Sequence, residues 1–331
     1  MVLALTLCAG SAGPAFASAD EVNLLRHYQP EYHERYVNYK NAHPELAYFD
    51  VVTYVNIGLD FPYYADEIVK NVTNPDSVYV LCNKYNRLPE DYVPPEYQNA
   101  GGRALFLRNE AQAQFDIMRA DAAKSGINIY IVSGYRSYAV QDQIYRNYKQ
   151  RDPNGADKYS ARPGHSEHQT GLAADLNTAS SSAHFEATKE FAWLLGNAHN
   201  YGFILRYPEG KEWLTGYMFE PWHWRYVGAK AAAEIKKSDI TFDEYCAIYL
   251  VPQNIKNVFD GVFGLRVLPL PVLFRPGEKE SSNHKADHSQ QRDSSEIYYR
   301  VEHHHVAVFR RSRIKHRPRQ VDAISHGHQP A

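Results

Sequence analysis

Residues 166–175 read SEHQTGLAAD, and this stretch predicts a turn that leads into a short buried strand. The strand, Leu172 to Leu176, is apolar except for Asp175. A carboxylate inside an apolar strand costs free energy unless it is paired or bound to a cation. A turn at Gly171 would let His168 and Asp175 face one point, and imidazole and carboxylate are ordinary zinc ligands. The alternative is a polar loop with a structural aspartate.

A second stretch, EPWHWRY at residues 220–226, predicts a strand with two different faces. Because strand side chains alternate, the aromatic residues would pack on one face while His223 and Arg225 point to the other. Pro221 disfavours a helical conformation at Glu220, which has the chemistry of a general base. With His223 as third ligand, two histidines and one carboxylate leave a zinc position open for water, as in catalytic sites. The alternative is a buried histidine in an aromatic core.

A third stretch, SGYRS at residues 133–137, follows a β-branched run at 127–133 that predicts a strand. Loops directly after strands often present functional groups. Arg136 is therefore a candidate to bind a carboxylate with two hydrogen bonds, or to stabilise an oxyanion. The alternative is a solvated arginine.

The remaining periodicity predicts an α+β fold, with an antiparallel sheet that carries helices on one side. Asn109 is the expected cap of a helix to about Ala123, and Thr241 with Glu244 is the expected capping box of the last helix. The other expected helices contain Val140, Ile144, Tyr145 and Tyr148; Phe191, Leu194, Leu195 and Ala198; and residues 229–237. The other expected strands are 203–207 and 222–227, with short ones at 51–55 and 77–81.

Four regions are expected along the chain. Residues 1–19 resemble a secretory signal peptide with an A-x-A cleavage site, which predicts a secreted or cell-wall-associated protein; the alternative is a short apolar helix of a cytoplasmic protein. Residues 20–100 are expected to form an N-terminal extension that wraps the main domain at 101–252. Residues 253–331 are polar and rich in His and Arg, which is typical of a disordered tail, or of an out-of-frame or chimeric end.

Composition restricts the function less than the motifs do. The formal charge of −2 over 331 residues does not favour binding to nucleic acid. We expect a monomer that contacts a membrane only through an uncleaved N-terminus. The three cysteines, Cys8, Cys82 and Cys246, cannot form a disulfide framework or a C-x-x-C metal site, so buried free thiols are expected.

Taken together, the three motifs resemble those of the VanY-type D-alanyl-D-alanine carboxypeptidases. The resemblance extends from about Val80 to Ile248 and includes NKYN at residues 83–86 and Leu88-Pro89. It implies a compact α+β fold shared with other peptidoglycan metallopeptidases and with the hedgehog signalling domain. It also implies a zinc-dependent enzyme that removes the terminal D-amino acid from peptidoglycan stem peptides.

The resemblance further implies a role for individual residues. His168, Asp175 and His223 would bind Zn²⁺, Glu220 would be the general base, and Arg136 would contact substrate. Further substrate contacts are expected from Gln143 (or Gln141), Ser160, Glu167 and Ser133. Two alternatives stay open: an L,D-carboxypeptidase or endopeptidase on the same scaffold, and a non-catalytic wall-binding module that retains zinc.

Overall fold

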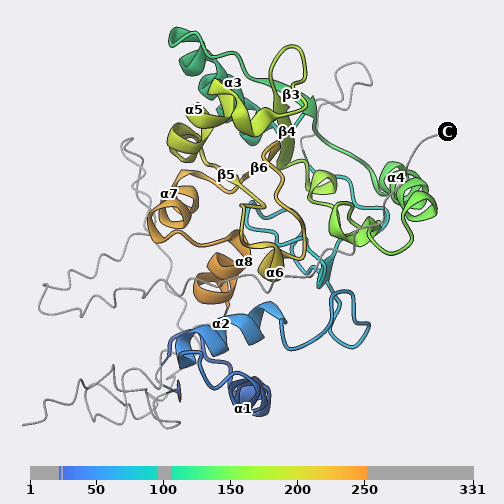
Figure 1. Ribbon diagram of the computed structural model, residues 1–331, viewed down its shortest axis with the longest axis vertical. Coiled ribbons are helices and arrows are strands. Elements are labelled where there is room, and N and C mark those ends of the chain that lie inside the picture. The colour runs from blue at the N-terminus through green and yellow to red at the C-terminus, as the bar shows by residue number, and fades with distance from the viewer. Residues whose placement is uncertain (1–21, 24, 96–105, 252–331) are drawn as a thin grey trace, which may run out of the picture. The chain divides into compact units, whose positions relative to one another are not determined.

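The computed structural model describes residues 22–23, 25–95 and 106–251, with a four-stranded antiparallel sheet at its centre (Figure 1). The strand order is β3 (Tyr130–Ser133), β4 (Ala173–Asn177), β6 (His223–Tyr226) and β5 (Phe203–Leu205). Ser133 pairs with Asp175, and Asp175 pairs with His223. Side chains from three strands are therefore brought to one row across the sheet, although they lie far apart in the sequence.

One face of this sheet packs on the main hydrophobic core. Leu176 and Trp224 point to this face and are fully buried, as the alternation of side chains predicts. Helices α3 (Asn109–Lys124) and α5 (Lys189–Asn197) supply the opposing apolar residues, among them Phe115 and Leu194. The α+β class and both helices are as predicted. Asp175 and His223 lie on the opposite face, where the site forms.

The ends of two helices test the capping predictions. Thr241 and Glu244 form the expected capping box at the start of α8 (Phe242–Tyr245). Asn109 is not a cap: it is the first residue of α3, and Arg108 precedes it without a side-chain capping bond. The helix instead begins where the Arg108 N–H donates to the carbonyl of Gly171 (2.8 Å), a tertiary contact that local sequence does not encode.

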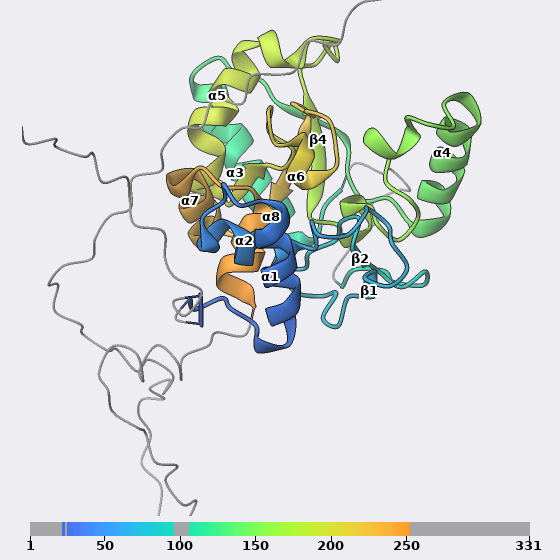
Figure 2. The same cartoon turned by 60° about the horizontal axis from the view of Figure 1, so that its bottom comes forward.

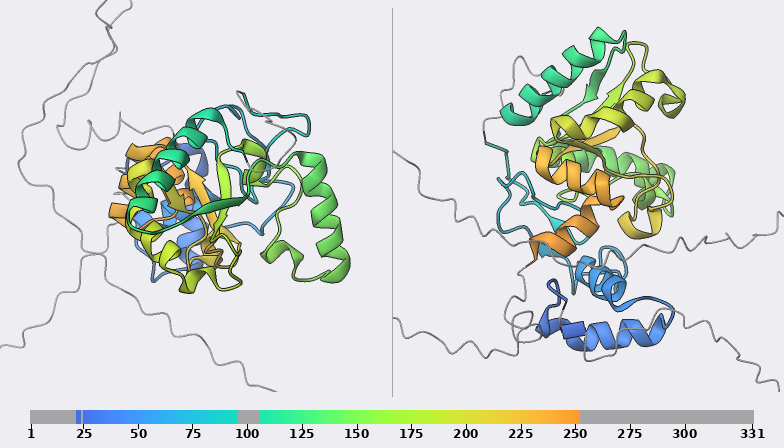
Figure 3. Two further views of the ribbon diagram at one scale, coloured as in Figure 1. Left: turned by 90° about the horizontal axis from the view of Figure 1, so that it is seen from above. Right: turned by 90° about the vertical axis from the view of Figure 1, so that its left-hand side faces the viewer.

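The N-terminal part of the described chain is helical where a strand was expected. Residues 51–55 lie in α2 (Tyr48–Ile57), which follows α1 (His33–Ala42). Figure 3 shows α2 next to α8, with α1 on the far side of α2; α2 packs against α1, α8 and the π-helix η7 (Cys246–Leu250). A short apolar run is ambiguous between a buried strand and a buried helix, and helical spacing lets Val51 and Val55 pack together here.

The second strand expected in this region is also wrong, because residues 77–81 form turns and an irregular segment. The buried guanidinium of Arg225 donates to the carbonyls of Val78 and Val80 (3.0 and 2.8 Å). These bonds satisfy backbone groups that a strand would otherwise pair in a ladder.

The remaining elements surround the sheet. Helix α4 (Tyr138–Arg151) stands to one side of the sheet (Figure 2), and α7 (Ala229–Ser238) packs with α8 around Ile204. Helix α6 (Glu212–Thr215) and the parallel pair β1 (Lys70–Asn71) and β2 (Asn86–Arg87) complete the set. Within the described part of the chain, no helix has the length and apolar character needed to cross a bilayer.

Four predictions concern residues that lie wholly or partly outside the described part of the chain. Cys82 and Cys246 are buried free thiols, as expected, whereas Cys8 lies outside the described residues. The signal-like segment 1–19 and the whole tail, residues 253–331, also lie outside them. The boundary between extension and main domain falls among residues that the structure does not describe, and it stays a prediction.

Candidate functional site

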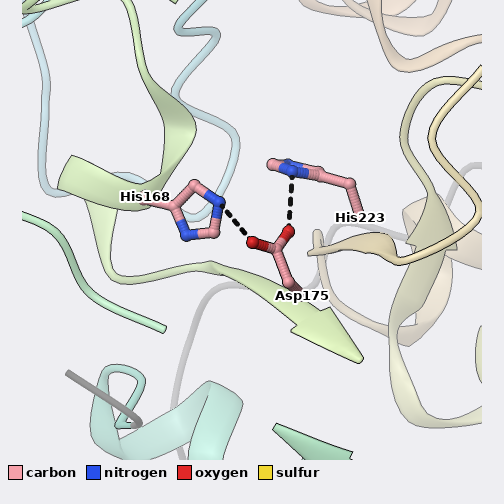
Figure 4. Close-up of side chains that lie close together, drawn as sticks. All are labelled: His168, Asp175 and His223. Carbon is pink, nitrogen blue, oxygen red and sulfur yellow. Dashed lines mark ion pairs between the residues drawn. The ribbon is translucent and has the colours of Figure 1, made fainter. Parts of the chain in front are cut away.

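Three side chains expected to bind metal meet on the open face of the sheet. His168, Asp175 and His223 each offer one ligand atom, and these atoms lie within 4.8 Å of one another. Figure 4 shows Asp175 between the two imidazoles: Oδ2 is 3.4 Å from Nε2 of His168, and Oδ1 is 3.3 Å from Nδ1 of His223. Because β4 pairs Asp175 with His223 on β6, sheet register accounts for half of this arrangement.

The other half comes from the turn that precedes β4. His168 lies in the short 3₁₀ helix η4 (Glu167–Thr170), which Gly171 ends with a φ of 68°. This left-handed conformation favours glycine and returns the chain toward the strand. The Nδ1–H of His168 donates to the carbonyl of Gly134 (2.7 Å). That bond leaves the Nε2 lone pair free to face Asp175 and a metal ion.

His223 is held by a carboxylate on its far side. Its Nδ1 faces Asp175, while its Nε2 lies 3.5 Å from Oε2 of Glu167. The Glu167 side chain is fully buried, and its Oε1 accepts hydrogen bonds from Arg206 (2.8 Å) and Arg225 (3.0 Å). Burial alone would raise the pKa of Glu167, but the two guanidinium groups outweigh burial and hold the pKa well below its ordinary value. A permanently charged carboxylate therefore stands behind the metal-facing imidazole.

The donor set fits a zinc ion. Asp175 Oδ1 is buried and has no hydrogen-bond partner among the described residues, which is costly for a carboxylate oxygen unless a cation is bound there. Two imidazoles and one carboxylate are the protein ligands of many catalytic zinc sites, and they leave a coordination position for water or substrate. His168, Asp175 and His223 would therefore hold Zn²⁺.

Glu220 lies beside the metal ligands without belonging to them. Its Oε2 is 3.6 Å from Nδ1 of His223. Its backbone N–H donates to the carbonyl of Tyr207 (3.2 Å), and this bond holds the bend before β6 that Pro221 favours. Burial raises the pKa of Glu220 to about 7. A carboxylate with that pKa is suited to accept and return a proton near neutral pH.

Arg136 reaches the same place from the loop after β3. Its guanidinium donates to Gln141 Oε1 (2.8 Å) and to Ser133 Oγ (3.0 Å), and Nη2 is 3.9 Å from Asp175 Oδ2. Gln141 in turn donates from Nε2 to the carbonyl of Ala161 (2.7 Å). Arg136 is thus oriented by neighbours on both sides while its side chain stays one-fifth exposed. It is positioned to meet a negatively charged group in the cavity.

A cavity of about 520 Å³ opens above these residues, and it tests the expected substrate contacts. Ser160 lines this cavity, together with Arg136, Glu220 and the three expected metal ligands. Gln143 does not line the cavity, because it is exposed on α4. The alternative, Gln141, lies on a different face of the same helix and is buried at the cavity. Of the two glutamines, the geometry supports Gln141.

Two further contacts have to be revised. Ser133 accepts a hydrogen bond from Arg136 and is not part of the lining, so it orients Arg136. Glu167 borders the cavity, but its side chain has no exposed area and both arginines occupy it, so it supports His223 from behind. Sequence reasoning missed Tyr207 and Tyr217, which also line the cavity. Trp222 was expected to pack with the other aromatic residues of its strand, but it is exposed and lines the cavity as well. No local pattern distinguishes these aromatic residues from the many others in the chain.

Comparison with known proteins points to one family. A family profile described as VanY, D-alanyl-D-alanine carboxypeptidase, matches residues 104–229. YodJ of Bacillus subtilis, which carries a provisional carboxypeptidase name, is 38% identical over 190 residues; the match covers 54% of this chain and 70% of that protein. A D-alanyl-D-alanine carboxypeptidase of Enterococcus faecium is 33% identical, with 57% of this chain and 55% of that protein covered. Among solved structures, the LdcB LD-carboxypeptidase is similar with 37% identity and a TM-score of 0.51, over 54% of this chain and 90% of that chain.

Proposed function

We propose, from the premise that this chain belongs to the VanY family of D-alanyl-D-alanine carboxypeptidases, that it removes the terminal D-alanine from peptidoglycan stem peptides. One observation carries the proposal. A metal-binding triad, a buried carboxylate with its pKa near 7 and an oriented arginine line one cavity. A structural metal site requires neither of the last two groups.

Each of these residues has a distinct role in peptide hydrolysis. Zinc held by His168, Asp175 and His223 is the cofactor, and it supplies a Lewis acid that polarises a carbonyl and acidifies water. Glu220 takes the proton of the attacking water and returns it to the departing amino group. Arg136 binds negative charge, either on the carbonyl oxygen or on the terminal carboxylate of the stem. Loss of such a preorganised contact at a developing oxyanion costs about 2.7–4 kcal/mol at the transition state.

L,D-carboxypeptidase activity is the second candidate, because the similar LdcB structure is of an LD-carboxypeptidase. The two activities differ in the configuration of the residue before the scissile bond, which pocket shape selects. A zinc-binding module without activity is disfavoured by Glu220, since a purely structural site needs no base beside an open coordination position.

Release of amino acid from defined stems separates these candidates. We expect the protein loaded with zinc to release D-alanine from a stem pentapeptide ending in D-Ala-D-Ala, and much less from the tetrapeptide. Preferential cleavage of the tetrapeptide would establish the L,D activity instead. Zinc at about one ion per chain with no release from either stem would support the binding module.

The location of the substrate bears on where the protein acts. Peptidoglycan lies outside the cytoplasmic membrane, so we propose a secreted or wall-associated monomer, with residues 20–100 as an extension of the catalytic domain. Fractionation of cells that express the full reading frame should recover the protein outside the cytoplasm. Recovery in the cytoplasmic fraction alone would contradict this location.

A further inference from the structure

Lys84 is a buried cation that the proposed chemistry does not use. Its residue is 2% exposed, and its ammonium donates to the backbone carbonyl of Asp157. Among the described residues it forms no ion pair with a carboxylate. Burial lowers the pKa of Lys84 to about 8. A buried charge with no carboxylate in direct contact carries a free-energy cost that persists only if the surroundings compensate it.

Three tyrosine rings add to the stabilisation that the carbonyl and the carboxylate of Asp157 give this ammonium. The ammonium lies 4.1 Å from the ring centre of Tyr217, 5.0 Å from Tyr64 and 5.4 Å from Tyr63, close enough for cation–π attraction. Gly216 makes this approach possible. A Cβ there would lie 2.6 Å from Lys84 Cε, and its φ of +76° is itself a conformation that favours glycine. We call Lys84 with Tyr63, Tyr64 and Tyr217 the tyrosine cage.

Two of the rings come from a segment that precedes the region matched by the family profile. Tyr63 donates from its hydroxyl to the carbonyl of Trp213 (2.7 Å), and the hydroxyls of Tyr64 and Tyr217 are 3.2 Å apart. Tyr64 has a φ of 62°, which is uncommon outside glycine and persists only where surrounding contacts hold it. Several contacts thus converge to fix this tyrosine.

The tyrosine cage also touches the wall of the catalytic cavity. Tyr217 lines the cavity directly, and Asp157, which Lys84 holds, leads along the chain to Ser160 in the lining. Arg162, just past Ser160, lies 4.0 Å from the Tyr64 ring centre and pairs with Asp157 (3.0 Å). The segment 157–162 is therefore held at both ends by the cage.

We propose that Lys84 and Tyr64 are positioning residues that hold the Ser160 wall of the cavity for substrate binding. The N-terminal segment 61–64 then helps to position the wall of the active site. The kinetic side of this inference rests on the proposed function. The lysine does not touch the reacting atoms, so its positioning effect passes through Asp157 and Tyr217.

The test uses Lys84→Met, which keeps the length of the side chain and removes its charge, and Tyr64→Phe, which removes only the hydroxyl. With zinc-loaded full-length protein and a stem pentapeptide, KM should rise about tenfold while kcat stays within about twofold, because ground-state binding is lost. Zinc content should not change. Lys70→Met is the matched control, because the exposed side chain of Lys70 contacts only Tyr32 among the described residues, and this variant should leave KM unchanged.

Amide hydrogen exchange gives a readout that needs no activity. The Ser160 N–H donates to the carbonyl of Ala156 (2.9 Å) and should exchange faster in both variants, while the amides of β4 keep their protection. Unchanged KM and unchanged Ser160 exchange would overturn the inference. If Lys84→Met does not fold, Tyr64→Phe decides by the same two measurements. An inactive parent protein would overturn the proposed function, and Ser160 exchange would still decide the positioning role.

Discussion

Glu220 and Asp175 are both carboxylates beside His223, yet their surroundings give them different chemistry. Burial would raise the pKa of Asp175, but His168 and His223 outweigh it and hold the pKa far below its ordinary value. Burial dominates at Glu220 and raises its pKa to about 7. Two carboxylates whose pKa values are pushed apart are typical of a ligand and a base in one site.

Glu220→Gln should therefore separate catalysis from metal binding. The amide keeps the size of the side chain and cannot accept the proton, so D-alanine release should fall by a factor of roughly 10²–10⁴. Zinc content, measured by elemental analysis, should stay at the parent value. Asp175→Asn is the contrasting variant, because a neutral amide is a poorer zinc ligand and the metal itself should be lost. Near-full activity of Glu220→Gln would exclude the general-base role.

Glu167 should affect zinc without touching it. Its Oε2 faces Nε2 of His223, and carboxylates in this position orient a metal-binding imidazole. Glu167→Gln should weaken zinc affinity by about 10–100-fold, as competition with a chromophoric chelator measures. Glu209→Gln changes an exposed carboxylate and serves as control. Equal zinc affinity of both variants and the parent would contradict the role given to Glu167.

Among the elements, the turn at Gly171 has the largest influence on the site. It ends η4 with a φ of 68°, and a Cβ there would meet Arg108 Cγ at 3.1 Å and Pro94 Cγ at 3.2 Å. The turn sets the position of His168 relative to β4. A side chain at position 171 would therefore crowd Arg108 and Pro94 and would also strain the backbone.

Gly171→Ala should lower the free energy of unfolding by about 1–3 kcal/mol and weaken zinc binding, because His168 must move. Urea unfolding and zinc titration measure the two effects. Gly196→Ala is the control, because Gly196 lies in α5 and has open space around it. This substitution should raise the free energy of unfolding by about 0.5–1 kcal/mol. A Gly171→Ala protein as stable as the parent would show that the turn tolerates a side chain.

At the scale of the whole molecule, buried neutral histidines link folding to pH. Burial lowers the pKa of His27 and of His165 to about 4. The unfolded chain binds these protons near pH 6.5, whereas the folded chain does not. Their contribution to stability is thus complete above about pH 6.5 and is lost as the pH falls toward 4.

His27→Gln isolates this effect away from the metal site. For the parent, His27 should reduce the free energy of unfolding by about 2 kcal/mol between pH 7 and pH 5, and the variant should lack that part of the decrease. Urea unfolding of both proteins at the two pH values gives the difference, in which any effect of zinc cancels. His184→Gln changes an exposed imidazole and should leave the pH dependence of the parent in place. Parallel pH profiles of His27→Gln and the parent would refute the linkage.

Features that depend on near neighbours in the chain could be predicted from the amino-acid sequence. The Asp in an apolar strand, the glycine turn before it and the alternation around His223 predicted which side chains would bind metal, and these three do converge. Helical periodicity predicted α3, α4 and α5, the Ala- and Lys-rich composition of residues 229–237 predicted α7, and the capping box predicted the start of α8. These signals are local, because hydrogen bonds and periodicity within a few residues produce them.

Features that depend on contacts between distant segments became visible only in the folded chain. Helix α4 presents Gln141 to the cavity instead of Gln143, and two arginines from other parts of the chain turn Glu167 away from substrate and toward His223. Packing against α8 favours a helix at residues 51–55, where a short apolar run alone is ambiguous. The type of a residue determines which chemistry its side chain can perform. Which neighbour it meets depends on strand register and helix packing, and no stretch of a few residues contains that information.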